Sequence, residues 1–183
     1  MNFKSYSFYI LFSIIFILNS CSKDTHTHSD HDAISRVIIK LKSATDSAEF
    51  SYTDLDGDGG NPPTISSTPL KQSRIYQASI TLYSGSSSPL KETTSEIQDE
   101  SKDHQFFFSS TVPGLTTAYA DKDPDNLPIG LLSTWTTTSS GSGKMKITLR
   151  HMPNKSAAGV SSGSIQNAGG ETDIEVEFDV QIQ

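Results

Sequence analysis

The sequence predicts an all-β protein, an antiparallel β-sandwich of immunoglobulin-like type with about eight strands, after an N-terminal signal peptide and a flexible tether. Three observations predict this fold. Apolar and polar residues alternate in several runs, most regularly near the C-terminus. Clusters of Gly, Pro, Ser and Asn separate these runs. No amphipathic helical pattern lies between consecutive runs, and this argues against a parallel α/β sheet.

The first twenty residues, "MNFKSYSFYILFSIIFILNS", have the pattern of a secretory signal peptide. They contain one positive charge, at Lys4, no acidic residue, and an apolar core over residues 8–18. Such a core rises only about 16 Å as a helix, which is too short for a hydrocarbon layer of about 30 Å. We therefore expect residues 1–20 to be removed from the mature protein.

Cys21, the only cysteine, directly follows this segment, and its position resembles the lipobox of bacterial lipoproteins. The resemblance implies cleavage before Cys21, a diacylglyceryl group on its sulfur, and a fatty acyl group such as palmitate on its amine. Several acyl chains anchor a protein stably in a membrane. Ser22 stands where an inner-membrane retention aspartate would be, which favours the outer membrane, on its periplasmic face or at the cell surface. An unpaired cysteine near a cleavage site is the alternative.

The mature chain is acidic and long enough for one domain. Removing Lys4 from 14 basic residues leaves 13 against 21 acidic ones, a net charge of −8, so nucleic acid is not an expected partner. Residues 21–33 contain "SKDTHTHSDHD", which has no large apolar side chain, and we expect a lipidated flexible tether there. Residues 34–183 are expected to form the sandwich.

Most of the predicted strands alternate clearly. In residues 143–151, Met145, Ile147 and Leu149 share one face. In the last run, the even-numbered residues from Ile174 to Ile182 are expected to face the core, and the odd-numbered ones, from Asp173, to face solvent. The full set of predicted strands is residues 35–42, 49–53, 75–83, 104–111, 116–120, 131–138, 143–151 and 172–183.

Residues 87–103, "SSPLKETTSEIQDESKD", depart from the strand pattern. Ser88 is a possible N-cap, and Pro89 suits the first position of a helix. We expect a short acidic helix or loop, too polar to contribute much to the core.

Two acidic loops are candidate calcium sites. "DLDGDGGN" places Asp54, Asp56 and Asp58 at alternate positions, and "DKDPDN" repeats the spacing at three further aspartates. An EF-hand is excluded because its twelfth position is Ile65. A calcium loop between strands and an ordinary turn rich in Asp and Gly both remain open. The second loop contains Asp121, Asp123 and Asp125.

The five histidines are candidate ligands for zinc, copper or nickel. Three of them, His26, His28 and His31, lie in the tether, where the alternative is a solvated polar linker. His104 and His151 continue the apolar faces of two predicted strands and are expected to point inward. They would bind a metal together or be hydrogen-bonded core residues. Arg150 lies on the opposite face and is expected to be a surface charge.

The aromatic residues are assigned to the core, although an aromatic binding surface is the alternative. We find no nucleophile elbow, no His-Glu-x-x-His and no phosphate loop, so the sequence predicts a protein that is not an enzyme. The aromatic residues concerned are Phe106, Phe107, Phe108, Tyr119 and Trp135.

The segments "HQFFF", "LRHMPNKSAAGV" and "NAGGETDIEVEFDVQI" resemble a family of small Bacteroidota lipoproteins that are labelled type 1 periplasmic binding fold proteins. The resemblance covers nearly all of residues 34–183 and implies no established substrate. That label implies two α/β lobes, whereas the residue pattern predicts the sandwich. Lipoproteins of this kind are often partners of TonB-dependent outer-membrane receptors.

The sequence thus predicts an outer-membrane lipoprotein that acts as a binding accessory for a metal ion or small ligand, with a TonB-dependent transporter as its partner. The alternative is a structural or adhesive cell-envelope module with calcium-stiffened loops.

Overall fold

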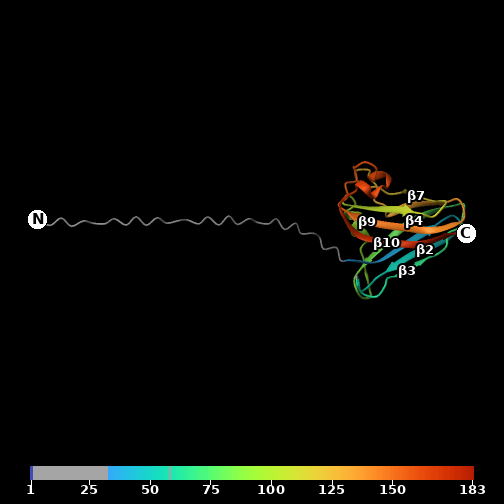
Figure 1. Cartoon of the computed structure of the whole chain (residues 1–183), viewed down its shortest axis with the longest axis horizontal. Helices are drawn as coiled ribbons and strands as arrows, with labels where there is room; N and C mark the ends of the chain where they lie inside the picture. Colours follow the sequence, from blue (N-terminus) through green and yellow to red (C-terminus); the bar gives the residue numbers. More distant parts are fainter. Residues whose placement is uncertain (2–32, 58) are drawn as a thin grey trace. The chain divides into compact units, whose positions relative to one another are not determined.

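The computed structural model describes Met1, residues 33–57 and residues 59–183, and it has the predicted all-β sandwich fold (Figure 1). A large sheet has the order β3-β2-β1-β4-β8-β7, with β5 paired to β4, and a small sheet has the order β10-β9-β6. Every pair of named strands is antiparallel. The large sheet contains β1 (Ile34–Lys42), β2 (Ser47–Thr53), β3 (Thr64–Ser67), β4 (Arg74–Ser84), β5 (Lys91–Glu92), β7 (Leu115–Tyr119) and β8 (Leu132–Thr137). The small sheet contains β6 (His104–Ser110), β9 (Gly141–His151) and β10 (Glu171–Ile182).

All eight predicted runs are strands, and β3 and β5 are additional. β3 pairs with β2 through four residues, of which Thr64, Ile65 and Ser66 are exposed. β5 has only two residues, both exposed. Because neither strand buries an alternating apolar face, neither leaves the periodic signal that identified the others.

The core lies between the two sheets, and β10 supplies one of its most regular faces. Val176, Phe178, Val180 and Ile182 are buried, whereas the intervening acidic residues are exposed. This confirms the predicted period for these four residues, whereas Ile174, which was also expected to face the core, is only partly buried. Phe178 packs on Phe50 of β2 with ring centroids 5.5 Å apart. The other large side chains at the centre of this core are Trp135, Tyr76 and Phe106.

Loop residues also form backbone hydrogen bonds with both edge strands of the small sheet. The amide of Leu70 donates to Gln181 O at 2.8 Å, and the amide of Gln183 donates to Leu70 O at 2.9 Å, which forms a short parallel bridge with the end of β10. At the opposite edge, the amide of Phe106 donates to Ile129 O at 2.7 Å. These contacts cover strand edges that would otherwise be open to another chain.

The acidic segment before β6 corrects two predictions. The helix α1 (Thr94–Asp99) begins after Thr93, not after Ser88, because the preceding residues Lys91 and Glu92 pair with β4 instead. The segment also contributes to the core, since Ile97 is only 3% exposed and packs in the main cluster. A single apolar residue in a polar stretch carries no period, so its burial could not be read from the sequence.

Residues 152–170 form a cap on the outer face of the small sheet, with two short 3-10 helices, η1 (Val160–Ser162) and η2 (Ile165–Asn167). Val160 and Ala168 bury Phe107 in a second, smaller cluster. Arg150 does not project freely from this face. Its guanidinium donates to Gly169 O at 2.7 Å and Gly170 O at 2.9 Å, and so ties the cap to β9.

Within the described residues, no helix is long and apolar enough to cross a membrane.

Candidate functional site

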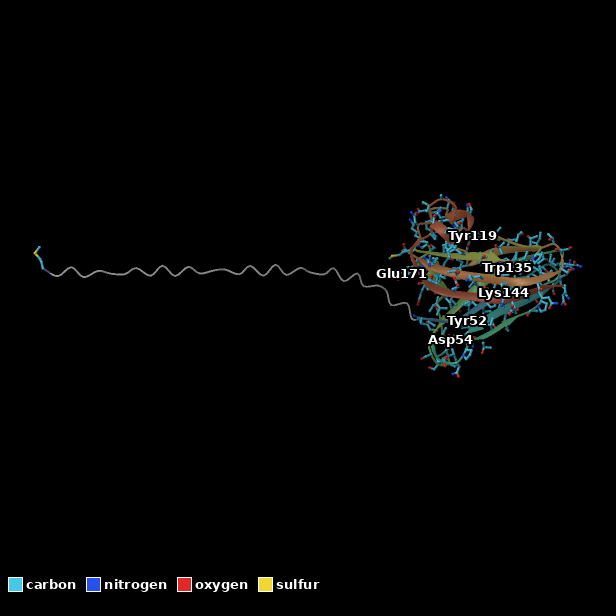
Figure 2. All side chains as sticks on the ribbon, in the orientation of Figure 1. Tyr52, Asp54, Tyr119, Trp135, Lys144 and Glu171 are labelled. Carbon is cyan, nitrogen blue, oxygen red and sulfur yellow. The ribbon has the colours of Figure 1, made fainter. Side chains whose placement is uncertain are left out.

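A groove of about 740 Å³ lies at one end of the sandwich, where the start of β1, the end of β2 and the start of β10 meet. We call it the end groove. Tyr52 and Asp54 lie at this end of the domain (Figure 2). Its side chains are acidic, hydroxylic or apolar, and none of the described residues that line it is basic. The polar lining residues are Ser35, Tyr52, Asp54, Asp56, Ser86, Thr172, Asp173 and Glu175, and the larger apolar ones are Ile34, Leu55 and Ile174.

The first acidic loop forms one wall of the end groove. The carboxylates of Asp54 and Asp56 accept hydrogen bonds from the loop's own backbone and so stabilise its turn. Asp54 accepts the amide of Gly57 at 2.9 Å and the hydroxyl of Tyr52 at 3.3 Å. Asp56 accepts both the amide and the side-chain N–H of Asn61, at 2.9 and 2.7 Å. These bonds from Asn61 lower the pKa of Asp56, so it stays ionised at neutral pH. Asp58 lies outside the described residues.

Asp173 forms the opposite wall and does not face solvent as predicted. The pairing of β10 with β9 shifts register between Thr172 and Ile174, so Asp173 sits at a bulge. A bulge leaves one residue out of the alternation and redirects its side chain. The Asp173 carboxylate accordingly turns toward His104, with Oδ2 3.4 Å from Nε2, and its side chain is only 19% exposed.

His104 contacts Asp173 of the end groove and is fully buried. Its Nδ1 lies 3.1 Å from the carbonyl oxygen of Glu100, and because a carbonyl only accepts, Nδ1 carries a proton. Burial acts to lower the pKa of His104, but the Asp173 carboxylate and the Glu100 carbonyl outweigh it, and the pKa lies above its usual value. The second ring nitrogen, Nε2, faces Asp173 Oδ2 at 3.4 Å.

His151 is the cross-strand partner of His104, and their rings stack with centroids 4.9 Å apart at 13°. The inward orientation predicted for His104 is confirmed, while His151 is partly exposed. The two imidazole rings therefore pack face to face. His26, His28 and His31 lie outside the described residues, as does Cys21, so the lipid anchor and the tether metal site stay predictions.

Glu175 is the fourth acidic residue that lines the end groove, and its side chain lies on the outer side of β10. Its Oε1 accepts from Lys146 Nζ at 2.6 Å and its Oε2 from the Thr148 hydroxyl at 3.0 Å. The Lys146 ammonium lowers the pKa of Glu175. The carboxylate is therefore ionised at neutral pH, and the Lys146 ammonium compensates its charge.

The second acidic loop is not part of the end groove, and its three aspartates serve different partners. Asp121 accepts the amides of Gly130 at 2.7 Å and Leu132 at 2.8 Å. Asp125 forms an exposed ion pair with Lys102 at 2.9 Å. These carboxylates satisfy backbone amides and a lysine, which is the role the turn interpretation gives them.

Asp123 and Lys155 form a buried ion pair that sequence reasoning missed. Lys155 Nζ lies 2.8 Å from Asp123 Oδ2 and donates to the carbonyl of Ser101 at 2.5 Å, with both charged side chains almost fully enclosed. Asp123 Oδ1 accepts the amides of Asp125 and Leu127, each at 2.9 Å. Burial acts to raise the pKa of Asp123, but Lys155 and these amides overcome it and lower it.

Within residues 33–57 and 59–183, no group of three or more His, Cys, Asp or Glu side chains is arranged to hold a metal. The aromatic residues are mainly structural, as predicted. Trp135, Phe106 and Phe107 are buried, and the Tyr119 hydroxyl donates to Phe106 O at 2.7 Å. Burial raises the pKa of Tyr119 to about 12. Phe108 is partly buried and packs against Trp135.

Comparisons of the chain with protein-family models, curated proteins and solved structures give no match, so the geometry alone carries the functional argument.

Proposed function

We propose that this protein is a lipid-anchored binding accessory of the outer membrane, which captures a small organic cation in the end groove. One observation carries the proposal: Asp54, Asp56, Asp173 and Glu175 line a single groove of about 740 Å³, with no basic side chain among the described lining residues. That volume is within the range that proteins use for small ligands.

The charge of the end groove selects the class of ligand. Asp56 and Glu175 stay ionised because their hydrogen-bond partners lower their pKa values. A groove lined by carboxylates attracts counter-ions of the opposite sign. Glu175 already accepts from Lys146, and Asp173 faces His104. An amine or guanidinium would therefore bind chiefly to Asp54 and Asp56, while the apolar surface of Leu55 and Ile174 accommodates the carbon chain that carries the charge.

Anchoring and delivery follow from the sequence pattern. Acylation at Cys21 attaches the domain to the membrane through the tether, and a TonB-dependent receptor is the partner to which a captured ligand would pass. The function is binding, without catalysis. Calcium-stiffened loops in a structural or adhesive module, with Asp54, Asp56 and Asp58 or Asp121, Asp123 and Asp125 as ligands, are the competing proposal.

Calorimetric titration of the mature protein with spermidine, arginine, calcium chloride and zinc chloride tests both proposals. We expect spermidine or arginine to bind, and the double variant Asp54→Asn, Asp56→Asn to bind about tenfold more weakly, because two of the four carboxylates are neutralised. Asp179→Asn is the matched control, since that carboxylate is on the exposed face of β10, outside the end groove.

Three results would contradict organic-cation capture. They are no heat with either organic cation, equal binding by the double variant, and equal loss in the control. Heat with calcium alone, together with a higher melting temperature, would support the structural alternative. Zinc binding that disappears when residues 22–32 are deleted would assign metal capture to the tether histidines. Zinc binding lost in His104→Ala would assign it to His104 and His151.

A further inference from the structure

The outer face of the large sheet carries two lysines that are not engaged by acidic residues. Lys40 and Lys42 lie on β1 and are both exposed. Glu49 of β2 is directly opposite Lys40, yet within the described residues neither lysine forms an ion pair. The lysines of the small sheet differ. Lys144 pairs with Glu177 and Asp179, and Lys146 pairs with Glu175.

The outer face of the large sheet carries a small excess of basic side chains. The outward residues of the large sheet include three basic side chains, Arg36, Lys40 and Lys42, and two acids, Glu49 and Glu92 of β5. The whole chain has a net charge of −7. A net positive face on an acidic protein attracts anionic partners and repels cationic ones.

Two shallow hollows lie on either side of these lysines. One, of about 470 Å³, includes Gln77, Ser79, Ala120 and Leu132 together with both lysines. The other, of about 360 Å³, includes Ser47, Glu49 and Thr68 with the same two lysines. Lys40 and Lys42 therefore form a ridge shared by two adjoining hollows, which we call the lysine ridge.

The strand register explains why these groups lie in rows across the sheet. Lys40 is opposite Ser79 of β4, and Ser79 is opposite Leu132 of β8. Lys42 is opposite Gln77, which in turn is opposite Thr134. An extended ligand that crosses from β8 to β1 would first meet Leu132 or Thr134, then the hydroxyl of Ser79 or the amide of Gln77, and then the ammonium group of a lysine. Neighbouring strands are about 4.8 Å apart, and this spacing sets the distances between the groups.

We propose that the lysine ridge and its two hollows bind an acidic polysaccharide. Its carboxylates would pair with Lys40 and Lys42, and its hydroxyls would bond to Gln77 and Ser79. Leu132, which is 48% exposed, would contact the C–H face of a sugar ring. The small net positive charge favours a glycan with spaced carboxylates over a duplex nucleic acid, whose charge density calls for many more basic residues.

Affinity electrophoresis and calorimetry of the mature protein test the proposal, with polygalacturonate as the acidic probe and dextran as the neutral one. We expect polygalacturonate to retard the protein and dextran not to. The double variant Lys40→Gln, Lys42→Gln should bind about tenfold more weakly, because it lacks both ammonium groups. Its affinity should also depend less on salt than that of the native protein. Since both positions are exposed, the variant should melt at the native temperature.

Lys144→Gln, Lys146→Gln is the matched control, because those lysines are already paired and lie on the other sheet. It should bind like the native protein. Equal binding of the Lys40 and Lys42 variant, equal binding of dextran, or an equal loss in the control would overturn the proposal. So would binding to vesicles of phosphatidylglycerol without binding to polygalacturonate, which would assign the surface to a membrane.

Discussion

The buried ion pair between Lys155 and Asp123 gives the most informative test of what holds the loops to the sandwich. We consider the substitution Lys155→Met, which keeps the length of the side chain and removes its charge. Asp123 would then remain enclosed, with a side chain that is 1% exposed, and without the ammonium group at 2.8 Å. Ser101 O would also lose its donor.

Removal of one partner of a buried ion pair destabilises a protein by about 3 to 5 kcal/mol, because the other charge stays desolvated and uncompensated. The amides of Asp125 and Leu127 still bond to Asp123, which favours the lower end, about 3 kcal/mol. For a domain of this size, that loss lowers the melting temperature by about 6 to 12 °C.

The assay is urea denaturation at pH 7, followed by tryptophan fluorescence from the buried Trp135. Lys102→Met is the matched control, because Lys102 pairs with Asp125 of the same loop but is exposed, and it should change the midpoint little. Lys155→Met combined with Asp123→Asn should recover part of the loss, since the isolated charge is gone. The reasoning is refuted if Lys155→Met costs no more than Lys102→Met.

Three further predictions follow from separate features. Because the pKa of His104 is raised in the folded protein, its contribution to stability is full below pH 6.5 and is lost as the pH rises through the folded value; urea midpoints should fall from pH 5.5 to 8.5, and His104→Gln should flatten this slope. An added Cβ at Gly170 would lie 2.1 Å from His151 O, whereas one at Gly169 meets nothing within 4 Å, so Gly170→Ala should lower the melting temperature well below that of Gly169→Ala, which shares only the positive φ. Labelling with an alkyne fatty acid should mark the native protein but not Cys21→Ser, and label retained by the variant would contradict lipidation.

The alternation of the strands was sufficient to predict the sandwich and the buried face of β10, because an antiparallel strand with one wet face repeats its burial every two residues. Asp173 was misplaced for the same reason. A bulge breaks the period at a single residue, and the contact it makes with His104 joins residues 69 positions apart, which a local pattern does not reveal.

The end groove could be anticipated only in part, and the buried ion pair of Lys155 and Asp123 could not be anticipated. The sequence indicated Asp54 and Asp56 as an acidic loop. Their position opposite Asp173 depends on the end of β2 and the start of β10, which belong to different sheets, lying at the same end of the sandwich. Lys155 lies in the cap, whose sequence has no hydrophobic period, and a charged residue in such a segment is normally expected to be exposed. Its burial becomes visible only when residues 101, 123 and 155 are brought together by the fold.

The bridge between Leu70 and the end of β10 has a consequence for the order in which the domain assembles. Most of the strand pairs of the large sheet join neighbours in the chain, but this bridge joins residues more than 100 positions apart. Loop closure of that length is slow relative to hairpin formation. Until Gln181 and Gln183 are in place, Leu70 lacks its backbone partners and the edge of β10 is open. The partly assembled domain therefore exposes an unpaired strand edge, and a chaperone that covers β10 until the bridge forms would raise the yield of folded protein.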